Sequence, residues 1–353
     1  MNLTRIQAAL CVWSVFILGE KMKVSEAVIK TIAKWYGLEC SELSRVIDTS
    51  RGVNDVRLNC IICDKYVIKI NSVNCIDEER LSEIARLVER YRKCGVYCPA
   101  LIRNEDGKYS HAIDIDGEKF ICYTEEFALF KVCGDTPMSR KKIVEHLGII
   151  ASRYTNIDLS DTNSMWSLID LAPLDTDVDE KQENLDSLVE CLKKINIGDL
   201  AEKVSCCNEK LREIISSRYK ELPRCCYQAD LNPENILVDD NGEFAGVIDF
   251  NLSGTEVNIN CFLNETNWFP QKEEFDSMSV EEMLTCMTER QNELLEAIFR
   301  HYELNPIECE MFPYYKRIID LEQYPNVCFL ISVLKDEERR NKAVDLIEAM
   351  ISE

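Results

Sequence analysis

Three polar residues in the second half of the chain have types and a spacing that suit chemistry on a phosphate group. Asp230 is followed five residues later by Asn235, and Asp249 precedes Phe250 at the end of a β-rich run. With this spacing one carboxylate can meet a substrate hydroxyl while an amide oxygen and a second carboxylate hold Mg²⁺. The chain contains neither G-x-x-x-x-G-K-[ST] nor G-x-G-x-x-G, so the phosphates would be bound by a different arrangement.

A predicted β-hairpin must position these three residues. Segment 224–250 reads as a turn followed by two β-rich runs, and its Asn241-Gly242 pair is the favoured two-residue hairpin loop. Asp230 and Asn235 then precede the first strand, and Asp249 ends the second. The hairpin therefore supplies the order of residues that phosphoryl transfer needs.

Segment 225–250 resembles the catalytic core of the aminoglycoside phosphotransferase family, a branch of the protein-kinase-like fold that includes choline and homoserine kinases. The family pattern His-Gly-Asp-Leu-His-Pro-x-Asn-Ile-Leu-Val, ending in Ile-Asp-Phe-Gly, is matched by residues 228–238 and 248–251. The resemblance implies that Asp230 is catalytic and that Asn235 and Asp249 are metal ligands. Gln228 and Asn232 stand where His is common, and Asn251 stands where Gly is usual. These departures bear on the orientation of Asp230 and on the subfamily.

Lys69 extends the resemblance toward the N-terminus. It is a cation on the otherwise apolar run Tyr-Val-Ile-Lys-Ile, and it resembles the family lysine that neutralises the α- and β-phosphates of the nucleotide. Its partner is expected to be Glu83 on the next helix, with Glu79 one turn earlier as the substitute. The alternative is an edge-strand lysine that extends into solvent.

Two further segments match the nucleotide site by position. Gly52 and Asn54 precede the first predicted strand, where the family has a short loop that covers the phosphates, and backbone N–H groups of such a turn can bind them. The strand that ends in Glu126, Phe127 and Ala128 corresponds to the hinge, whose backbone would pair with adenine.

The expected fold is α+β, bilobal and protein-kinase-like. Residues 1–128 would form an N-terminal nucleotide-binding lobe, with a five-stranded antiparallel sheet and one helix beside an N-terminal helical extension. Residues 129–353 would form a mostly helical catalytic and substrate-binding lobe. Strands are predicted at 56–62 and 66–70, and helices at 24–37, 77–94, 140–155, 183–219, 280–302 and 328–352. Acceptor recognition is expected from 155–190 and from the region after Thr255.

The net charge of the chain limits the classes of partner that it can bind. The 353 residues carry a net charge of −22, which disfavours nucleic acid because phosphate backbones require clustered Lys and Arg. Residues 1–128 hold 18 Lys and Arg against 19 Asp and Glu, and the remainder holds 23 against 44. A lobe this acidic favours a cationic acceptor, although carboxylates that merely keep the protein in solution are the competing interpretation.

Cysteine usage indicates a reducing compartment. The 18 cysteines are scattered, and the lone C-x-x-C of Cys60 and Cys63 has no second pair at zinc spacing, so reduced thiols in the cytoplasm are expected. The apolar run 8–18 imitates a signal peptide but lacks a cleavage site after it. A packed N-terminal helix is preferred there over a signal or anchor, and no membrane partner is expected.

The leading hypothesis is an ATP-dependent small-molecule kinase that uses Mg²⁺ and transfers the γ-phosphate to a hydroxyl of a cationic acceptor, such as an aminoglycoside or another aminoalcohol. One alternative is a non-catalytic nucleotide-binding protein of the same fold, suggested by the altered residues around Asp230. Another is a protein or peptide kinase, which is disfavoured because no Ala-Pro-Glu motif follows Phe250.

Overall fold

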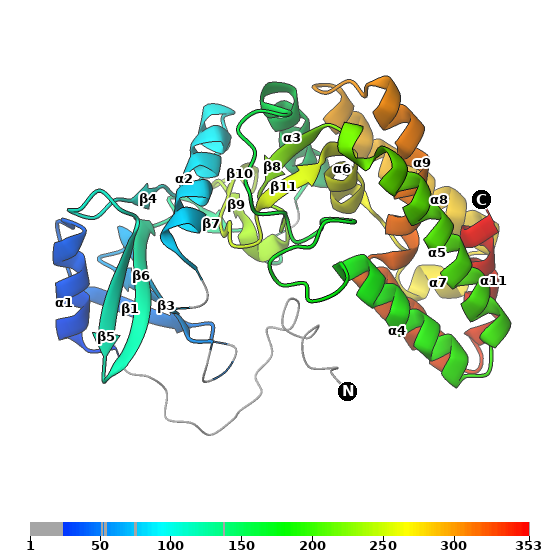
Figure 1. Ribbon diagram of the computed structural model, residues 1–353, viewed down its shortest axis with the longest axis horizontal. Coiled ribbons are helices and arrows are strands. Elements are labelled where there is room, and N and C mark those ends of the chain that lie inside the picture. The colour runs from blue at the N-terminus through cyan, green and yellow to red at the C-terminus, as the bar shows by residue number, and fades with distance from the viewer. Residues whose placement is uncertain (1–23, 51, 53–54, 74–75, 137, 353) are drawn as a thin grey trace. The chain divides into compact units, whose positions relative to one another are not determined.

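A computed structural model gives the fold of the chain (Figure 1). It describes residues 24–352 except 51, 53–54, 74–75 and 137, so the apolar run 8–18 and Asn54 lie outside the described residues. The chain divides into two compact units. The first comprises Met1–Glu89 and Cys98–Leu129, and the second comprises Arg90–Tyr97 and Phe130–Glu353.

The first unit contains an antiparallel sheet with strand order β1-β2-β3-β6-β4, in which β5 also pairs with β6. The strands are β1 (Leu43–Asp48), β2 (Arg57–Ile62), β3 (Tyr66–Ser72), β4 (Leu101–Ile102), β5 (Ser110–Ile115) and β6 (Glu118–Glu126), and the helices are α1 (Glu26–Trp35) and α2 (Glu78–Lys93). The described residues thus give six strands instead of the five expected. The two-residue β4 is too short to show a periodic pattern in the sequence.

The β2–β3 hairpin sets the face on which each side chain lies. Its turn has positive φ at Cys63 (52°) and Asp64 (50°), which is the twist that two-residue hairpin loops favour, and Lys65 N–H donates to Ile62 O at 3.0 Å. The predicted strands 56–62 and 66–70 correspond to β2 and β3. Ile68 and Ile70 of β3 are fully buried against the core that α1 also lines, so Lys69 between them lies on the opposite face of the sheet.

A disulfide joins Cys40 to Cys63 in the first unit. The expectation that all cysteines are thiols is therefore wrong for this pair. The hairpin turn places the Cys63 Cα atom 6.6 Å from that of Cys40, which precedes β1, within the range that disulfides span. This proximity depends on the pairing of β1 with β2, which the spacing of cysteines along the chain does not reveal.

The second unit is mostly helical, with two small sheets. One sheet has the order β10-β9-β7 and the other pairs β11 with β8. The strands are β7 (Lys131–Val132), β8 (Arg224–Tyr227), β9 (Ile236–Val238), β10 (Phe244–Val247) and β11 (Gly254–Val257). The helices are α3 (Arg140–Tyr154), α4 (Glu180–Lys194), α5 (Gly198–Arg218), α6 (Asn258–Thr266), α7 (Lys272–Ser277), α8 (Val280–Phe299), α9 (Pro306–Glu322), α10 (Tyr324–Lys335) and α11 (Arg340–Ser352).

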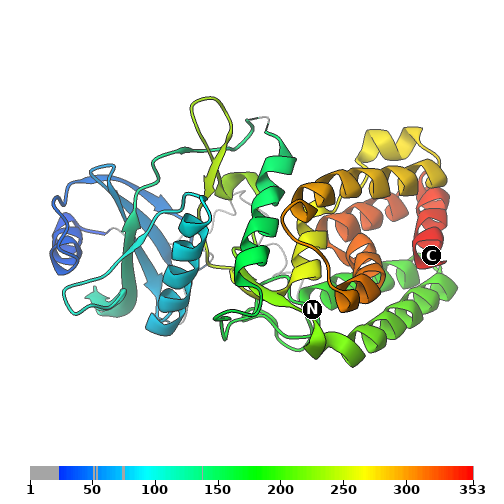
Figure 2. The same ribbon diagram turned by 90° about the horizontal axis from the view of Figure 1, so that it is seen from above.

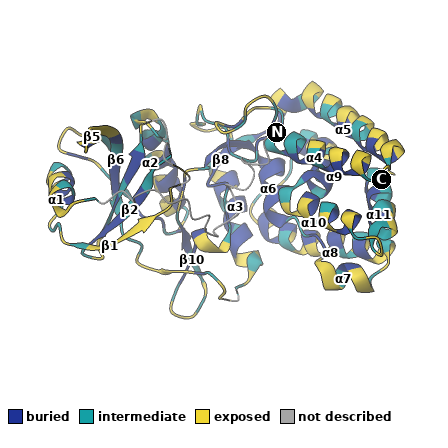
Figure 3. Ribbon diagram, turned by 90° about the horizontal axis from the view of Figure 1, so that it is seen from below, coloured by how far each residue is buried: buried dark blue, intermediate teal, exposed yellow. Residues whose placement is uncertain are grey.

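Helices α4, α5 and α7 to α11 of the second unit line one apolar core. Helices α4, α5, α9, α10 and α11 lie side by side, and each presents a buried stripe to the others and an exposed stripe to solvent (Figures 2 and 3). The single helix predicted at 183–219 is divided into α4 and α5, because Asn196 adopts a left-handed φ of 65°. The predicted helix at 328–352 likewise divides at Asp336, which caps the end of α10 in extended backbone.

The β9–β10 hairpin exists as expected, but its loop is longer than two residues. Asp239 N–H donates to Glu243 O at 2.9 Å, Gly242 N–H donates to Asp239 O at 3.0 Å, and Gly242 has a φ of 78°. This is a turn followed by a left-handed residue, the next most common hairpin connection. The hairpin holds Asn235 before β9 and Asp249 after β10.

Candidate active site

Asp230 lies in the loop that follows β8, and neutral amides bind its carboxylate. Asn232 Nδ2 donates to Oδ1 at 2.7 Å. Asn235 Nδ2 donates to Oδ2 at 2.8 Å and to the main-chain oxygen of Asp230 at 3.1 Å. The structure therefore brings two of the three predicted residues into direct contact.

The surroundings of Asp230 raise its affinity for a proton. Burial raises the pKa of Asp230 to about 6, and the negative charges of Asp249 and Glu265 act in the same direction, while the hydrogen bonds from Asn232 and Asn235 oppose them. At neutral pH the carboxylate is mostly ionised. It can accept or orient the proton of a hydroxyl in that state.

Asp249 follows β10 and is tied to the Asn235 segment through the backbone. Ile248 N–H donates to Asn235 O at 2.9 Å, and Asn251 N–H donates to Asp249 Oδ1 at 3.2 Å. Asp249 has a φ of 57° and Ala229, beside Asp230, has a φ of 61°. Left-handed backbone costs a non-glycine residue about 1–3 kcal/mol and occurs often at functional sites. Both strained residues here adjoin or belong to the predicted catalytic set.

Gln228 bridges the two loops. Its Oε1 accepts the N–H of Asp230 at 2.8 Å, while its Nε2 donates to the main-chain oxygens of Ile248 at 3.0 Å and Asp249 at 2.7 Å. The side chain has no exposed surface. Gln228 thus orients both loops with a neutral amide in a position where the family commonly has His. The sequence identified this residue only as a departure from the pattern.

Tyr91 supports the same loops from the C-terminal part of α2 that belongs to the second unit. Its hydroxyl accepts the N–H of Gln228 at 2.9 Å, and its fully buried ring lies edge-on to Phe250, with 5.3 Å between ring centroids. Aromatic pairs in this geometry stabilise beyond the area they bury. Tyr91 is a residue that sequence reasoning missed, because it is distant in the chain and matched only the apolar period of a helix.

Lys69 lies on β3 of the first unit and forms an ion pair with Glu125. The distance from Nζ to Glu125 Oε1 is 3.0 Å, and both side chains are mostly buried. The predicted partner Glu83 accepts a hydrogen bond from Arg80 at 3.1 Å, so a Lys69–Glu83 pair stays a prediction. Strand register could have indicated Glu125: Lys69 is opposite Tyr123, and a residue two positions along a strand lies on the same face.

The other predicted nucleotide contacts are backbone positions. Gly52 is exposed and pairs with Asp55 through a bridge in which Asp55 N–H donates to Gly52 O at 3.2 Å. At the expected hinge, Phe127 N–H donates to Lys65 O at 2.8 Å and Glu126 ends β6. Ala128 follows outside any strand. Pairing of this backbone with adenine stays a prediction.

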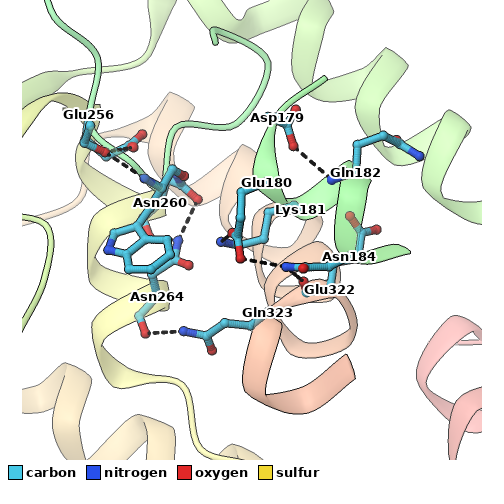
Figure 4. Close-up of polar contacts among 12 residues, drawn as sticks. Asp179, Glu180, Lys181, Gln182, Asn184, Glu256, Asn260, Asn264, Glu322 and Gln323 are labelled. Atoms are coloured by element: carbon cyan, nitrogen blue, oxygen red, sulfur yellow. Dashed lines mark hydrogen bonds and ion pairs between the residues drawn. The ribbon is translucent and has the colours of Figure 1, made fainter. Parts of the chain in front are cut away.

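A second buried polar group lies among α4, α6 and the end of α9 (Figure 4). We call it the Lys181 cluster. Its members are Ser164, Trp166, Asp179, Glu180, Lys181, Asn184, Arg212, Glu256, Asn260 and Glu322. Lys181 Nζ is 2.7 Å from Glu180 Oε2 and 5.0 Å from the centroid of the Trp166 ring. Arg212 pairs with Asp179 at 2.6 Å and with Glu322 at 3.5 Å.

Two carboxyl groups of the Lys181 cluster hold protons tightly, whereas a third is held in its ionised form. Burial raises the pKa of Glu256 to about 7 and that of Glu322 to about 8, whereas the hydrogen bonds and charge of Arg212 outweigh burial and lower the pKa of Asp179. Ser164 Oγ donates to Glu256 Oε2 at 2.6 Å. Apart from Arg212, the cluster falls in the two sequence ranges expected to recognise the acceptor, but its charged side chains are mostly buried.

The chain is similar to proteins of known family and structure. The model of the phosphotransferase enzyme family matches residues 59–256. No curated protein matches the chain. Among solved structures, an amicoumacin kinase in complex with AMP-PNP, Ca²⁺ and Ami has a TM-score of 0.52 at 13% identity, covering 94% of each chain. A microcompartment-associated aminopropanol kinase has a TM-score of 0.49 at 12% identity, covering 93% of this chain and 96% of that one.

The fold and the family expectation are confirmed together. The described residues form an antiparallel sheet unit and a mostly helical unit, and the family match covers the hairpin that carries Asp230, Asn235 and Asp249. Within the described residues, no helix is both long and apolar enough to cross a membrane. The chain belongs to the phosphotransferase enzyme family and is a phosphotransferase.

Proposed function

We propose that the protein is an ATP-dependent small-molecule kinase that transfers the γ-phosphate to a hydroxyl of a cationic acceptor, an aminoglycoside or another aminoalcohol, in the cytoplasm. The observation that carries the proposal is the Asp230 carboxylate, which two amides hold in place beside Asp249. Neutral donors orient a carboxylate without neutralising its charge, so the carboxylate can still accept a proton. Phosphoryl transfer to an alcohol requires a group that accepts or orients the hydroxyl proton.

Asp230 would orient the acceptor hydroxyl and take its proton late in the reaction. The transition state of phosphoryl transfer is loose, so positioning of the nucleophile contributes much of the rate. The contacts of Gln228, Asn232 and Asn235 supply that positioning. Because these residues make definite hydrogen bonds to Asp230, the departures from the family pattern do not favour a non-catalytic protein.

Asn235 and Asp249 suit a magnesium ion by the chemistry of their donors. An amide oxygen and a carboxylate are hard oxygen ligands of the kind that Mg²⁺ prefers. Asn235 turns its Nδ2 to Asp230, so its Oδ1 is the atom that can face a cation, and the Ile248–Asn235 backbone bond keeps Asp249 near. Bound Mg²⁺ would neutralise charge on the triphosphate. Lys69 would add a positive charge for the α- and β-phosphates, and Gly52, Glu126, Phe127 and Ala128 would supply backbone contacts to the nucleotide.

The acceptor is proposed to be cationic because charge is unevenly distributed. Residues 1–128 are nearly neutral, whereas the later residues hold 23 Lys and Arg against 44 Asp and Glu. A negative potential attracts an ammonium-bearing alcohol and repels an anionic one. The amicoumacin kinase of similar fold was solved with AMP-PNP and Ca²⁺, which supports a nucleotide and a divalent cation as ligands.

The proposal is tested by a nucleotide-consumption screen with Mg²⁺ and ATP over aminoglycosides, other aminoalcohols, homoserine and neutral sugars. We expect turnover with an amine-bearing alcohol. For the best acceptor, kcat/KM should fall between 0.05 and 0.5 M KCl, mainly through the KM of the acceptor, because screening shortens the Debye length from about 10 Å at 0.1 M toward about 3 Å at 1 M. A neutral or anionic best acceptor, or a flat salt profile, would contradict the cationic assignment alone.

Metal binding is tested separately by thermal shift with Mg²⁺-ATP. A ligand at a hundredfold excess over its Kd stabilises the folded state by about 2.7 kcal/mol. Asp249→Asn should lose the part of the shift that depends on Mg²⁺, while Asp240→Asn, an exposed substitution on the β9–β10 loop, should keep it. If Asp249→Asn retains the full shift, the metal assignment is wrong.

A further inference from the structure

The carbonyl of the residue that follows Asp230 is bound by an ion pair. Arg140, the first residue of α3, donates from Nη1 to Leu231 O at 2.7 Å. Arg140 Nη2 donates to Glu265 Oε2 on α6 at 2.6 Å and to Glu265 O at 3.1 Å. One guanidinium group thus joins the backbone of the catalytic loop to a buried carboxyl group of α6.

Glu265 is the buried member of this ion pair. Only 8% of its side chain is exposed. Burial raises the pKa of Glu265, and the charge and hydrogen bonds of Arg140 oppose that rise. Arg140 therefore favours the ionised form of Glu265, and the ion pair holds the guanidinium group beside the Leu231 carbonyl.

We infer that Arg140 is a positioning residue for phosphoryl transfer: held by Glu265, it binds the Leu231 carbonyl, a contact we call the clamp, and so sets where the Asp230 carboxylate stands. The inference rests on the proposed function, in which Asp230 faces the acceptor hydroxyl. Arg140 has no role in the motif that identifies the family. It lies about ninety residues before Asp230 in the chain, and only the fold brings it to the loop.

An ordinary structural ion pair is the competing interpretation, and the molecule contains a matched control for it. The side chain of Arg218 is 36% exposed, as is that of Arg140, and it bridges Glu221 at 2.8 Å and Glu310 at 3.2 Å. These partners belong to the region around the end of α5 and to α9, not to the catalytic loop. Arg218→Met removes an equivalent cation without touching Leu231.

Hydrogen exchange tests the clamp without any acceptor. In Arg140→Met we expect the Asp230 amide, which donates to Gln228, to exchange at least tenfold faster than in the wild type, whereas Arg218→Met should leave it within twofold. Arg140→Lys keeps the charge but has no planar fork, so an intermediate rate is expected. Equal Asp230 exchange in Arg140→Met and Arg218→Met would overturn the clamp. If Arg140→Met does not fold, Arg140→Lys and Glu265→Gln carry the same comparison.

Kinetics test the catalytic consequence. With the acceptor from the screen, Arg140→Met should lower kcat at least tenfold and change the KM for ATP less than twofold, and Arg140→Lys should recover part of the kcat. An unchanged kcat in Arg140→Met would refute the positioning role. Absence of turnover with every acceptor would instead refute the proposed function, and hydrogen exchange would still report on the clamp.

Discussion

Two buried regions of the second unit hold carboxylates by different means. At the catalytic loop, the carboxylate of Asp230 accepts hydrogen bonds from the amides of Asn232 and Asn235. In the Lys181 cluster, Lys181 pairs with Glu180, and Arg212 pairs with Asp179 and Glu322 (Figure 4). Burial raises the pKa of a carboxyl group in both regions.

The difference separates residues with a catalytic role from residues that hold the helices together. An amide fixes the direction of a carboxylate and leaves its charge in place, so the group can still meet a proton. A cation cancels the charge of an ionised partner, as Arg212 does for Asp179. The further hydrogen bond from Arg212 to Glu322 links α9 to α4 and α5. The catalytic loop also contains left-handed Ala229 and Asp249, whereas the charged residues of the cluster lie mainly in regular helices. Substitutions in the two regions should therefore affect different measurements.

The largest effect is expected from Asp230→Asn. The asparagine keeps the shape but cannot accept the hydroxyl proton, so kcat should fall about 10³-fold, within the range of general-base catalysis. The new side chain is uncharged but fills the same space beside the Asn232 and Asn235 amides, so the melting temperature should change only slightly. Steady-state kinetics beside Asp240→Asn measure the difference. A variant that keeps more than a tenth of the wild-type kcat would show that Asp230 is not the proton acceptor.

Lys181→Met should produce the opposite result, a stability loss with little change in kcat. Lys181 is 1% exposed, and its removal leaves Glu180 and neighbouring carboxyl groups buried without their cation. Breaking a buried pair from one side costs about 3–5 kcal/mol. Denaturant titration measures the loss, with Lys194→Met as the control, since the Lys194–Glu190 pair is exposed and should contribute little. If Lys181→Met changes kcat more than it changes the free energy of unfolding, the Lys181 cluster takes part in catalysis.

Glu322→Gln should flatten the pH dependence of stability. The folded-state pKa of Glu322 is raised to about 8 from an ordinary value of 4.5, so the native state holds a proton that the unfolded state has lost. Stability from this group is complete below pH 4.5 and is lost as pH rises toward 8. Glutamine stays neutral, and the variant should lose less stability than the wild type between pH 5 and 8. If the wild type and the variant lose the same stability between pH 5 and 8, the raised pKa of Glu322 is contradicted.

Asn232→Ala should have the smallest effect, which is confined to the acid limb of the pH profile of kcat/KM. The amide of Asn232 lowers the pKa of Asp230, so its removal raises that pKa further above about 6. The acid limb of kcat/KM should move to higher pH, with less than a tenfold loss at pH 7 and recovery near pH 8. Asn241→Ala on the exposed hairpin loop is the control. A uniform loss at all pH values would indicate displaced geometry instead of a changed titration.

Local patterns predicted the parts of the site that are contiguous in the chain. The spacing of Asp230, Asn235 and Asp249 and the turn signal at Asn241-Gly242 identified the hairpin, because a hairpin is specified by neighbouring residues. The same reasoning identified β2, β3 and the position of Lys69. It gave Gln228 and Asn232 as departures, and only the structure shows that both bind Asp230.

Contacts between distant segments could not be predicted in this way. Glu125, Tyr91 and Arg140 act through strand register or through helix packing, neither of which a single sequence specifies. The Cys40–Cys63 disulfide depends on how β1 meets the β2–β3 turn. The break at Asn196 was missed because the apolar period continues across it, while the backbone there turns to the left.

The left-handed backbone at Ala229 limits which mutations the gene can retain at this codon. From an alanine codon, single base changes lead to glycine, aspartate, valine and threonine, among others. Glycine relieves the strain of a φ of 61°, and aspartate tolerates it, whereas β-branched valine and threonine are genuine outliers in that conformation. A mutation of Ala229 to glycine, the residue of the family pattern, is therefore tolerated beside Asp230. Mutations to valine or threonine, which also need only one base change, are not.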